Sequence, residues 1–210
     1  MRLLLHCCCG PCSLLVAEHF RQLGEEPAGW FFNPNIHPEE ERRRREATLA
    51  KAATAAGIPL LPGGPEMPFD EWLLALARCG GLPADLSAVG LPKAEALTKA
   101  GRRCPACYQI RLEATAAEAA RLGFDAFSST LLISPYQDLE AIAEIGRVAG
   151  ARAGVEFRFA DLRGRYTDSR ERARELELYQ QNYCGCVFSA LERAERRAKR
   201  ALGKVLAPFA

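Results

Sequence analysis

Eight of the nine cysteines in this chain fall into three short groups, and these groups are the residues best suited to chemistry. They are Cys7-Cys8-Cys9-Gly10-Pro11-Cys12, Cys104-Pro105-Ala106-Cys107 and Cys184-Gly185-Cys186. A single cysteine is often just a small buried hydrophobic residue, but closely spaced thiols in several groups are typical of metal binding or redox chemistry. We therefore predict that the three groups contribute to a functional site.

Four thiolates in a tetrahedral array suit either a zinc ion or an iron–sulfur cluster. The adjacent Cys8 and Cys9 favour the cluster, because neighbouring side chains diverge and two irons of a larger centre could each take one. Structural zinc usually holds together small segments that lack a core, whereas these thiols follow a strand of a sheet that could fold without them. The residues favour a functional metal centre and leave a zinc-stabilised RNA-binding module as the alternative.

A further alternative needs no metal. Cys9-Gly10-Pro11-Cys12 has the dithiol sequence of thioredoxins, which would make the protein a thiol-disulfide oxidoreductase. A thioredoxin has an earlier strand and helix and a Trp before its first Cys, but only eight residues precede Cys9 here. In Cys184-Gly185-Cys186 the thiols are close enough to favour a strained, easily reduced disulfide over an ordinary zinc site. We expect that pair to act as a redox shuttle.

The composition is that of an ordinary globular protein, with 210 residues, 49% hydrophobic and 26% charged residues and a net charge of +2. This length suits one well-buried core, so we expect a single α/β domain over residues 1–210. No apolar run approaches the roughly 18 to 20 residues that span a bilayer, and no signal peptide is evident. We predict a cytoplasmic protein with no membrane partner, whose cysteines serve metal or redox chemistry rather than disulfides.

The elements that position the thiols alternate between strands and helices. The apolar run Leu3-Leu4-Leu5 predicts a buried strand, and Gly10-Pro11 ends it and opens a helix. Further strands are expected at 28–32, 58–62, 124–132 and 155–159, and helices at 11–24, 39–56, 68–78, 104–122, 136–149, 168–178 and 186–202. This order predicts a parallel, three-layer sheet with an irregular insertion at about 79–100 and a C-terminal helical segment at about 168–204.

The thiols would then lie at one edge of that sheet. In an open α/β sheet, ligands bind beyond the carboxyl ends of the strands. The first thiol group follows the first strand, and Cys104 and Cys107 begin a helix on which both sulfurs can point to one face. The positive end of a helix lowers thiol pKa values and favours the thiolate that binds metal. Strand alternation turns Cys7 away from Cys8, so we expect Cys7 to be a bystander.

The small net charge neither requires nor excludes a nucleic-acid partner. The positions of the arginines are more informative. In the run 39–46 acids stand three or four residues before arginines, which predicts a solvated, salt-bridged helix face. Other basic residues, in loops and on the final helix, could line a groove for an acidic polymer, and the alternative for the helix is a solvated surface. These residues are Arg102, Arg103, Arg163, Arg165, Arg193, Arg196, Arg197, Lys199, Arg200 and Lys204.

Five motifs together resemble the QueH family of epoxyqueuosine reductases, in that family's order from residue 3 to about 190. The motifs are His6-Cys7-Cys8-Cys9-Gly10-Pro11-Cys12-Ser13, Phe32-Asn33-Pro34-Asn35-Ile36-His37-Pro38, Arg103-Cys104-Pro105-Ala106-Cys107-Tyr108, Ser129-Thr130-Leu131-Leu132-Ile133-Ser134-Pro135-Tyr136-Gln137 and Tyr179-Gln180-Gln181-Asn182-Tyr183-Cys184-Gly185-Cys186. Two positions depart from the family pattern, since Ala is expected at Gly10 and a non-thiol at Cys7.

The resemblance implies a Rossmann-like fold similar to the nucleotide alpha-hydrolase, or HUP-like, group. In those relatives the loop after the first strand holds phosphate, and here that loop carries thiols. The implied enzyme is an iron–sulfur oxidoreductase that reduces the epoxide of epoxyqueuosine at the wobble position of tRNA by two electrons. Its products are queuosine and water, in the last step of queuosine biosynthesis. The implied partners are this tRNA and an electron donor that the sequence does not identify.

The resemblance also implies roles for individual residues. By motif position, the ligands of a [4Fe-4S] cluster are Cys8, Cys9, Cys104 and Cys107, and the redox-active disulfide joins Cys184 and Cys186. The family is associated with an additional mononuclear iron, for which Cys12 is the candidate ligand, and such an iron would bind the epoxide oxygen. The candidate proton donors are His37, Tyr136, Tyr183 and Asp138. His37 could equally cap the helix that follows it.

Overall fold

The computed structural model describes residues 1–82 and 102–206, in which four parallel strands form one sheet in the order β2-β1-β3-β4. The strands are β1 (Arg2–His6), β2 (Glu26–Trp30), β3 (Ala126–Ser129) and β4 (Glu156–Phe157). A parallel bridge between Gly29 and Leu60 adds a further segment beside β2. From that edge, the segments are third, second, first, fourth and fifth along the chain, which is the Rossmann-like order.

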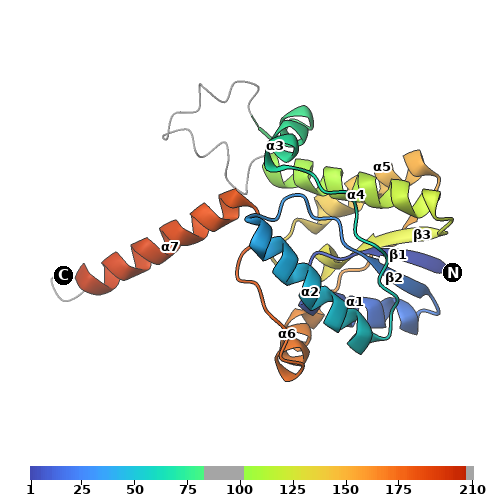
Figure 1. Cartoon of the computed structure of the whole chain (residues 1–210), viewed down its shortest axis with the longest axis horizontal. Helices are drawn as coiled ribbons and strands as arrows, with labels where there is room; N and C mark the ends of the chain where they lie inside the picture. Colours follow the sequence, from blue (N-terminus) through green and yellow to red (C-terminus); the bar gives the residue numbers. More distant parts are fainter. Residues whose placement is uncertain (83–101, 207–210) are drawn as a thin grey trace.

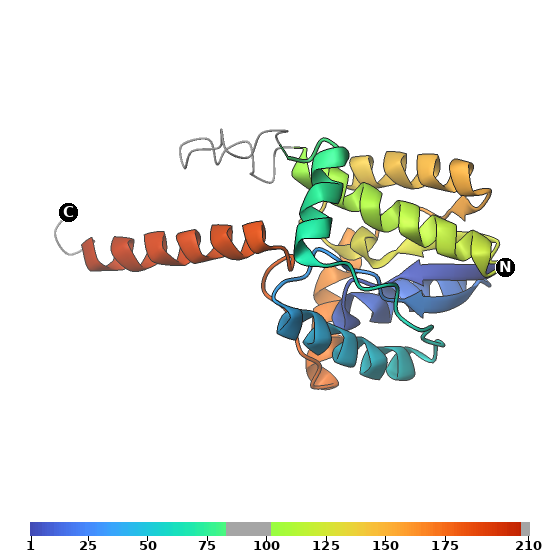
Figure 2. The same cartoon turned by 45° about the horizontal axis from the view of Figure 1, so that its top comes forward.

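Helices lie on both faces of the sheet, as Figure 2 shows, and give the three layers that the sequence predicts. The helices of the described residues are α1 (Gly10–Gln22), α2 (Glu39–Ala56), α3 (Phe69–Arg78), α4 (Arg103–Arg121), α5 (Leu139–Ala153), α6 (Tyr166–Glu175) and α7 (Val187–Leu206). Helix α1 packs against α2 and α6, and α4 packs against α5.

The alternating side chains of β1 divide the core between the two faces. Leu3 and Leu5 pack in one hydrophobic cluster with Val16 of α1. Leu4 points the other way and packs with Leu112 of α4 and Ile142 of α5. All three leucines are fully buried, which is what a central parallel strand requires when helices cover both of its faces.

The largest difference from the predicted elements follows β3. The apolar run 124–132 predicts one strand, but β3 ends at Ser129 and a 3₁₀ turn, η2 (Thr130–Ile133), takes its place. The Ser129 hydroxyl accepts a hydrogen bond from the backbone N–H of Leu131, at 3.1 Å, and so begins the turn. The turn is itself buried, so its hydrophobic residues continue the pattern of the strand. The irregular insertion predicted at about 79–100 falls largely on residues 83–101, outside the described residues.

The C-terminal helix α7 extends away from the rest of the chain (Figure 1). Leu191 and Leu202 are exposed on it, and from residue 194 to 202 every residue is exposed. No helix of residues 1–82 and 102–206 has the length and apolar character that a membrane crossing needs. The exposed surface of α7 is also basic, which bears on the partner considered below.

We predict that Gly146→Ala destabilises the protein, although alanine in a helix interior normally stabilises it. A methyl group at Gly146 of α5 would overlap two ring atoms of Phe157 on β4. The expected loss is about 1–3 kcal/mol of unfolding free energy, measured by anaerobic urea titration. Gly164→Ala is the control, because nothing lies within 4 Å of a methyl group there. Equal midpoints for the two variants would contradict this account of helix–sheet packing.

Candidate metal and redox site

Three cysteines lie together where β1 gives way to α1. The sulfurs of Cys8, Cys9 and Cys12 are all within 4.8 Å of one another. Cys9 is the N-cap of α1, and its Sγ accepts a hydrogen bond from the backbone N–H of Cys12, at 3.4 Å. The end of the strand and the first turn of the helix thereby place three thiols at the carboxyl edge of the sheet. These three side chains can hold a metal ion.

Gly10, between these thiols, allows α1 to approach α2 closely. A methyl group at this position would lie 2.8 Å from both the side chain and the carbonyl oxygen of Thr48. The backbone of α2 therefore leaves little space for the alanine that the family pattern leads us to expect. This departure from the family pattern has a steric cause in this chain.

Thr130 of η2 supports the thiol of Cys8. Its hydroxyl accepts a hydrogen bond from the Cys8 N–H, at 2.9 Å, and donates one to Cys8 Sγ, at 3.2 Å. Hydrogen bonds from Cys12 and Cys9, and then from Thr130, lower the pKa of Cys8 well below its usual value. Burial raises the pKa of Cys9 to about 12. Cys8 is thus the member of this group that most readily becomes a thiolate.

Cys7 lies apart from this group, as strand alternation predicts. Its side chain is fully buried in the cluster of Leu3 and Leu5, and Sγ donates a hydrogen bond to the carbonyl oxygen of Leu5, at 3.3 Å. Burial raises the pKa of Cys7 above its usual value. Cys7 therefore behaves as a core residue.

Cys104 and Cys107 lie in the first turn of α4. Cys104 packs against the same hydrophobic cluster as Cys8, and Cys107 is buried in a neighbouring cluster that also contains Cys186. Burial raises the pKa of Cys107 to about 11. Among the described residues, neither sulfur joins the compact group of the first three thiols.

The loop between α6 and α7 carries Cys184 and Cys186. Gly185 has a φ of +118°, and a methyl group there would lie 2.9 Å from Ile36 Cγ1, so the loop requires glycine on both grounds. Its backbone is held by Arg45, which donates to the Cys184 carbonyl oxygen at 2.9 Å, and by His37, whose N–H donates to the Gly185 carbonyl oxygen at 2.8 Å. The loop is therefore fixed beside α2.

The two thiols of this loop differ in accessibility. Cys184 is exposed and Cys186 is buried, and neither forms a disulfide. A hydrogen bond from Cys186 lowers the pKa of Cys184, and the same contact, followed by burial, raises the pKa of Cys186. Cys184 is thus the more accessible thiol of the two and the one that more readily becomes a thiolate.

Three buried arginines surround the thiols, and the sequence reasoning did not identify Arg45 or Arg111 as site residues. Arg45 pairs with Glu41 at 2.7 Å, and Arg103 pairs with Glu192 at 2.8 Å. Arg111 of α4 donates through Nε to the Cys107 carbonyl oxygen at 3.2 Å, while Nη2 is buried without a partner. Helical spacing could have revealed Arg111, which stands seven residues after Cys104 and four after Cys107.

The prediction that Arg103 lines a basic groove is wrong, since this side chain is buried. Arg163 pairs with Asp161, and Arg165 pairs with Glu18 at 2.7 Å, so the charges of these loop residues are already engaged. The predicted salt-bridged face of α2 is confirmed, with Arg42 bridging Glu39, Glu46 and Glu66. Of the predicted basic residues, Arg102 and the exposed arginines of α7 remain at the surface.

The candidate proton donors differ in how they are held. His37 does not cap α2, because the N-cap is Pro38 and no side chain bonds to it; instead Nε2–H of His37 donates to the Pro34 carbonyl oxygen at 3.1 Å. The Tyr183 hydroxyl donates to the carbonyl oxygen of His37 at 2.8 Å. Asp138 caps α5 by accepting from the Ala141 N–H, and Tyr136 is exposed. Tyr183 thus lies in the same loop as Cys184.

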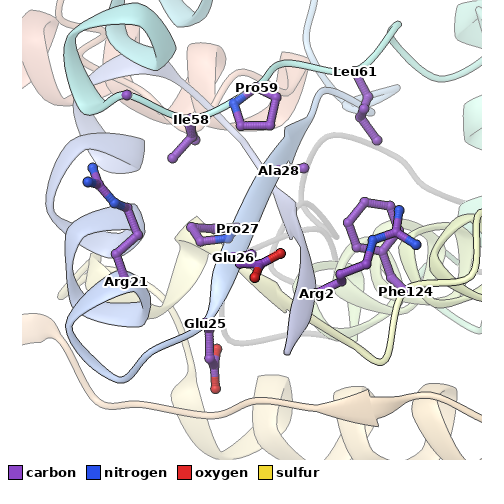
Figure 3. Close-up of a pocket in the computed structure, with 11 residues that line it drawn as sticks. Arg2, Arg21, Glu25, Glu26, Pro27, Ala28, Ile58, Pro59, Leu61 and Phe124 are labelled. Atoms are coloured by element: carbon purple, nitrogen blue, oxygen red, sulfur yellow. The ribbon is translucent and has the colours of Figure 1, made fainter.

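Two cavities lie at opposite ends of the sheet. One, of about 460 Å³, is at the amino ends of β1 and β2, where Figure 3 shows Arg2, Glu26 and Phe124 around it. The other, of about 380 Å³, includes Asn33 and His37 and lies beyond the carboxyl end of β2. Asn33 also donates a hydrogen bond to the Cys7 carbonyl oxygen, at 2.8 Å. The smaller cavity is therefore the one that shares an edge with the thiols.

The chain is thus an α/β protein with a Rossmann-like parallel sheet and a group of thiols at the carboxyl edge of that sheet. Within that class, residues 3–192 match the profile of the family described as epoxyqueuosine reductase QueH. The chain belongs to this family.

Individual relatives are similar over most of the chain. The "Epoxyqueuosine reductase QueH" of Dehalococcoides mccartyi is 34% identical over 192 residues, which cover 91% of this chain and 94% of that protein. The protein of the same name from Thermotoga maritima is 35% identical over 201 residues, with 93% and 94% covered. Among solved structures, a predicted subunit of tRNA methyltransferase from Methanocaldococcus jannaschii has a TM-score of 0.51 at 15% identity, covering 83% of this chain and 75% of that chain. This last likeness concerns the fold alone.

We predict that Cys184 reacts faster than Cys186 with iodoacetamide in the reduced protein, by at least about tenfold. Cys184 is exposed with a lowered pKa, whereas Cys186 is buried with a raised one. Quenched labelling followed by peptide mass spectrometry gives both rates in one sample, and Cys184→Ser isolates the rate of Cys186. Equal rates would contradict the distinction between outer and inner thiol.

Proposed function

We propose that this protein reduces the epoxide of epoxyqueuosine in tRNA to the alkene of queuosine, with release of water. The reaction takes up two electrons and two protons. The observation that carries the proposal is the compact group of Cys8, Cys9 and Cys12 at the carboxyl edge of the sheet, where the three sulfurs lie within 4.8 Å of one another. The family to which the chain belongs is named for this activity.

In this proposal Cys8, Cys9, Cys104 and Cys107 hold a [4Fe-4S] cluster, and Cys12 is the candidate ligand of an additional iron. The donor set fits such a group, because it is made of thiols and because the buried Nη2 of Arg111 lacks an acceptor among the described residues. When bound, the cluster would supply electrons one at a time. The surrounding residues hold its ligands, and Thr130 stabilises the thiolate of Cys8.

The Cys184 and Cys186 pair can supply the electrons and protons that the reaction consumes. Closing a disulfide between them releases two electrons and two protons, which equals what the epoxide takes up. An external donor must then return two electrons and two protons to reopen the disulfide. Cys184 is exposed and is therefore the thiol that such a donor can reach. Tyr183, next to it, is a candidate for proton transfer to the departing oxygen.

We assign the tRNA-binding surface to α7. Arg196, Arg197 and Arg200 are exposed on this helix, and none of them forms an ion pair with another described residue. Lys199 is exposed beside them and pairs with Glu195 at 2.7 Å. A helix that presents unpaired arginines to solvent can contact the phosphate backbone of an RNA. The polar contacts of α7 are thus proposed to position the tRNA rather than to read its sequence.

The two alternatives make different demands on the same thiols. The compact group of Cys8, Cys9 and Cys12 could hold a single zinc ion, as an RNA-binding module would require. A thioredoxin-like oxidoreductase would use Cys9 as its nucleophile, but burial raises the pKa of Cys9 to about 12. Metal and sulfide content separates these alternatives from the reductase.

We predict that Cys107→Ser abolishes reduction of epoxyqueuosine-containing tRNA and lowers the iron and acid-labile sulfide content of protein purified without oxygen. Cys79→Ser is the matched control, because Cys79 lies at the end of α3, outside the three thiol groups. It should retain the wild-type content of about four irons and four sulfides per chain. Stoichiometric zinc without sulfide in the wild-type protein would contradict the proposed function.

We predict that replacing Arg196, Arg197 and Arg200 with Gln weakens tRNA binding and makes it less dependent on salt. Loss of three phosphate contacts should reduce the slope of log affinity against log salt by about 2 to 3. Fluorescence anisotropy at several salt concentrations measures this slope. The control is Arg147→Gln, an exposed arginine of α5 paired with Glu144. An unchanged slope in the triple variant would exclude α7 from the interface.

A further inference from the structure

Arg111 is a fully enclosed cation without an anionic side chain to balance it among the described residues. Its side chain is 2% exposed. Nε donates to the carbonyl oxygen of Cys107, at 3.2 Å, and the guanidinium lies 5.8 Å from the centre of the Tyr108 ring. Nη2 is buried and has no hydrogen-bond partner in the described part of the chain. A buried charge in this state is costly unless an anion is placed beside it.

The other two buried arginines differ from Arg111 because each has a carboxylate partner. Arg45 has Glu41, and Arg103 has Glu192, so each of these cations is balanced by a carboxylate of the protein. Arg111 instead lies against the turn of α4 that carries the thiols, where Nε donates to the carbonyl oxygen of Cys107 at 3.2 Å. Its buried Nη2 has no acceptor among the described residues. The anion that Arg111 requires is therefore associated with the sulfur groups.

We propose that Arg111 is the fixed positive charge of the metal centre, which pairs with the net negative cluster and its thiolates and raises their reduction potential. This inference rests on the cluster of the proposed function. A cluster becomes more negative when it accepts an electron, so a cation held beside it stabilises the reduced form more than the oxidised form. Charge and hydrogen bonds to sulfur are two main determinants of the potential of such a cluster.

The position of Arg111 suits this role. It stands on α4, the helix that provides Cys104 and Cys107, and helical spacing places it on their face of the helix. A guanidinium keeps its proton at any working pH and offers several donors in a fixed plane. One of those donors, Nη2, has no acceptor among residues 1–82 and 102–206. Arg111 is thus a positioning residue that acts through the cluster.

The test compares Arg111→Met, which removes the charge, with Arg111→Lys, which keeps it. The readout is the midpoint potential of the cluster, from a redox titration followed by electron paramagnetic resonance, with iron and sulfide content measured on the same samples. For Arg111→Met we expect the ratio of reduced to oxidised cluster at the wild-type midpoint to fall at least tenfold, a shift of about 59 mV for one electron. Arg111→Lys should retain most of the wild-type potential. Arg147→Met, which removes an exposed arginine of α5, should leave it unchanged.

The outcomes distinguish this inference from the function on which it rests. A cluster in Arg111→Met with the wild-type potential overturns the role of Arg111 and leaves the proposed function intact. Equal shifts in Arg111→Met and Arg111→Lys also overturn it, since the charge would then not matter. Loss of iron and sulfide in Arg111→Met but not in Arg111→Lys supports the charge role. Wild-type protein without iron and sulfide overturns both proposals.

Discussion

His6, the last residue of β1, connects the carboxyl ends of three strands, and the thiol site is built on that connection. Its Nδ1 accepts a hydrogen bond from the Ser129 hydroxyl at 2.9 Å, and its Nε2–H donates to the Phe32 carbonyl oxygen at 3.1 Å. Burial lowers the pKa of His6 to about 4, so the ring is neutral at physiological pH. These bonds hold the end of β1 in place, and they therefore also position Cys8 and Cys9, which follow it in the chain.

The site balances sulfur against positive charge. Thiols from β1, α4 and the loop before α7 meet three buried arginines, two of which are neutralised by Glu41 and Glu192. The remaining charge, on Arg111, has no carboxylate partner among the described residues, and Nε donates to the carbonyl oxygen of Cys107. A buried cation without a carboxylate partner is costly unless an anion lies beside it, and the nearby group of Cys8, Cys9 and Cys12 could hold a metal ion.

Much of this arrangement follows from local sequence patterns. The apolar run of β1 and the Gly-Pro break placed the first thiols correctly at the start of α1, and helix α2 has the predicted limits 39–56 because Gly57 ends it in the left-handed conformation. The pairing of Arg45 with the backbone of Cys184 was not predictable, since it joins residues 139 positions apart. The burial of Arg103 was missed for the same reason, because Glu192 is distant in sequence.

The most direct test of the account is a crystal structure of protein grown without oxygen, with anomalous scattering recorded at the iron and zinc edges. The account predicts iron enclosed by the sulfurs of Cys8, Cys9, Cys104 and Cys107, on the side of α4 that carries Arg111. A single zinc ion held by Cys8, Cys9 and Cys12, with no iron present, would contradict it.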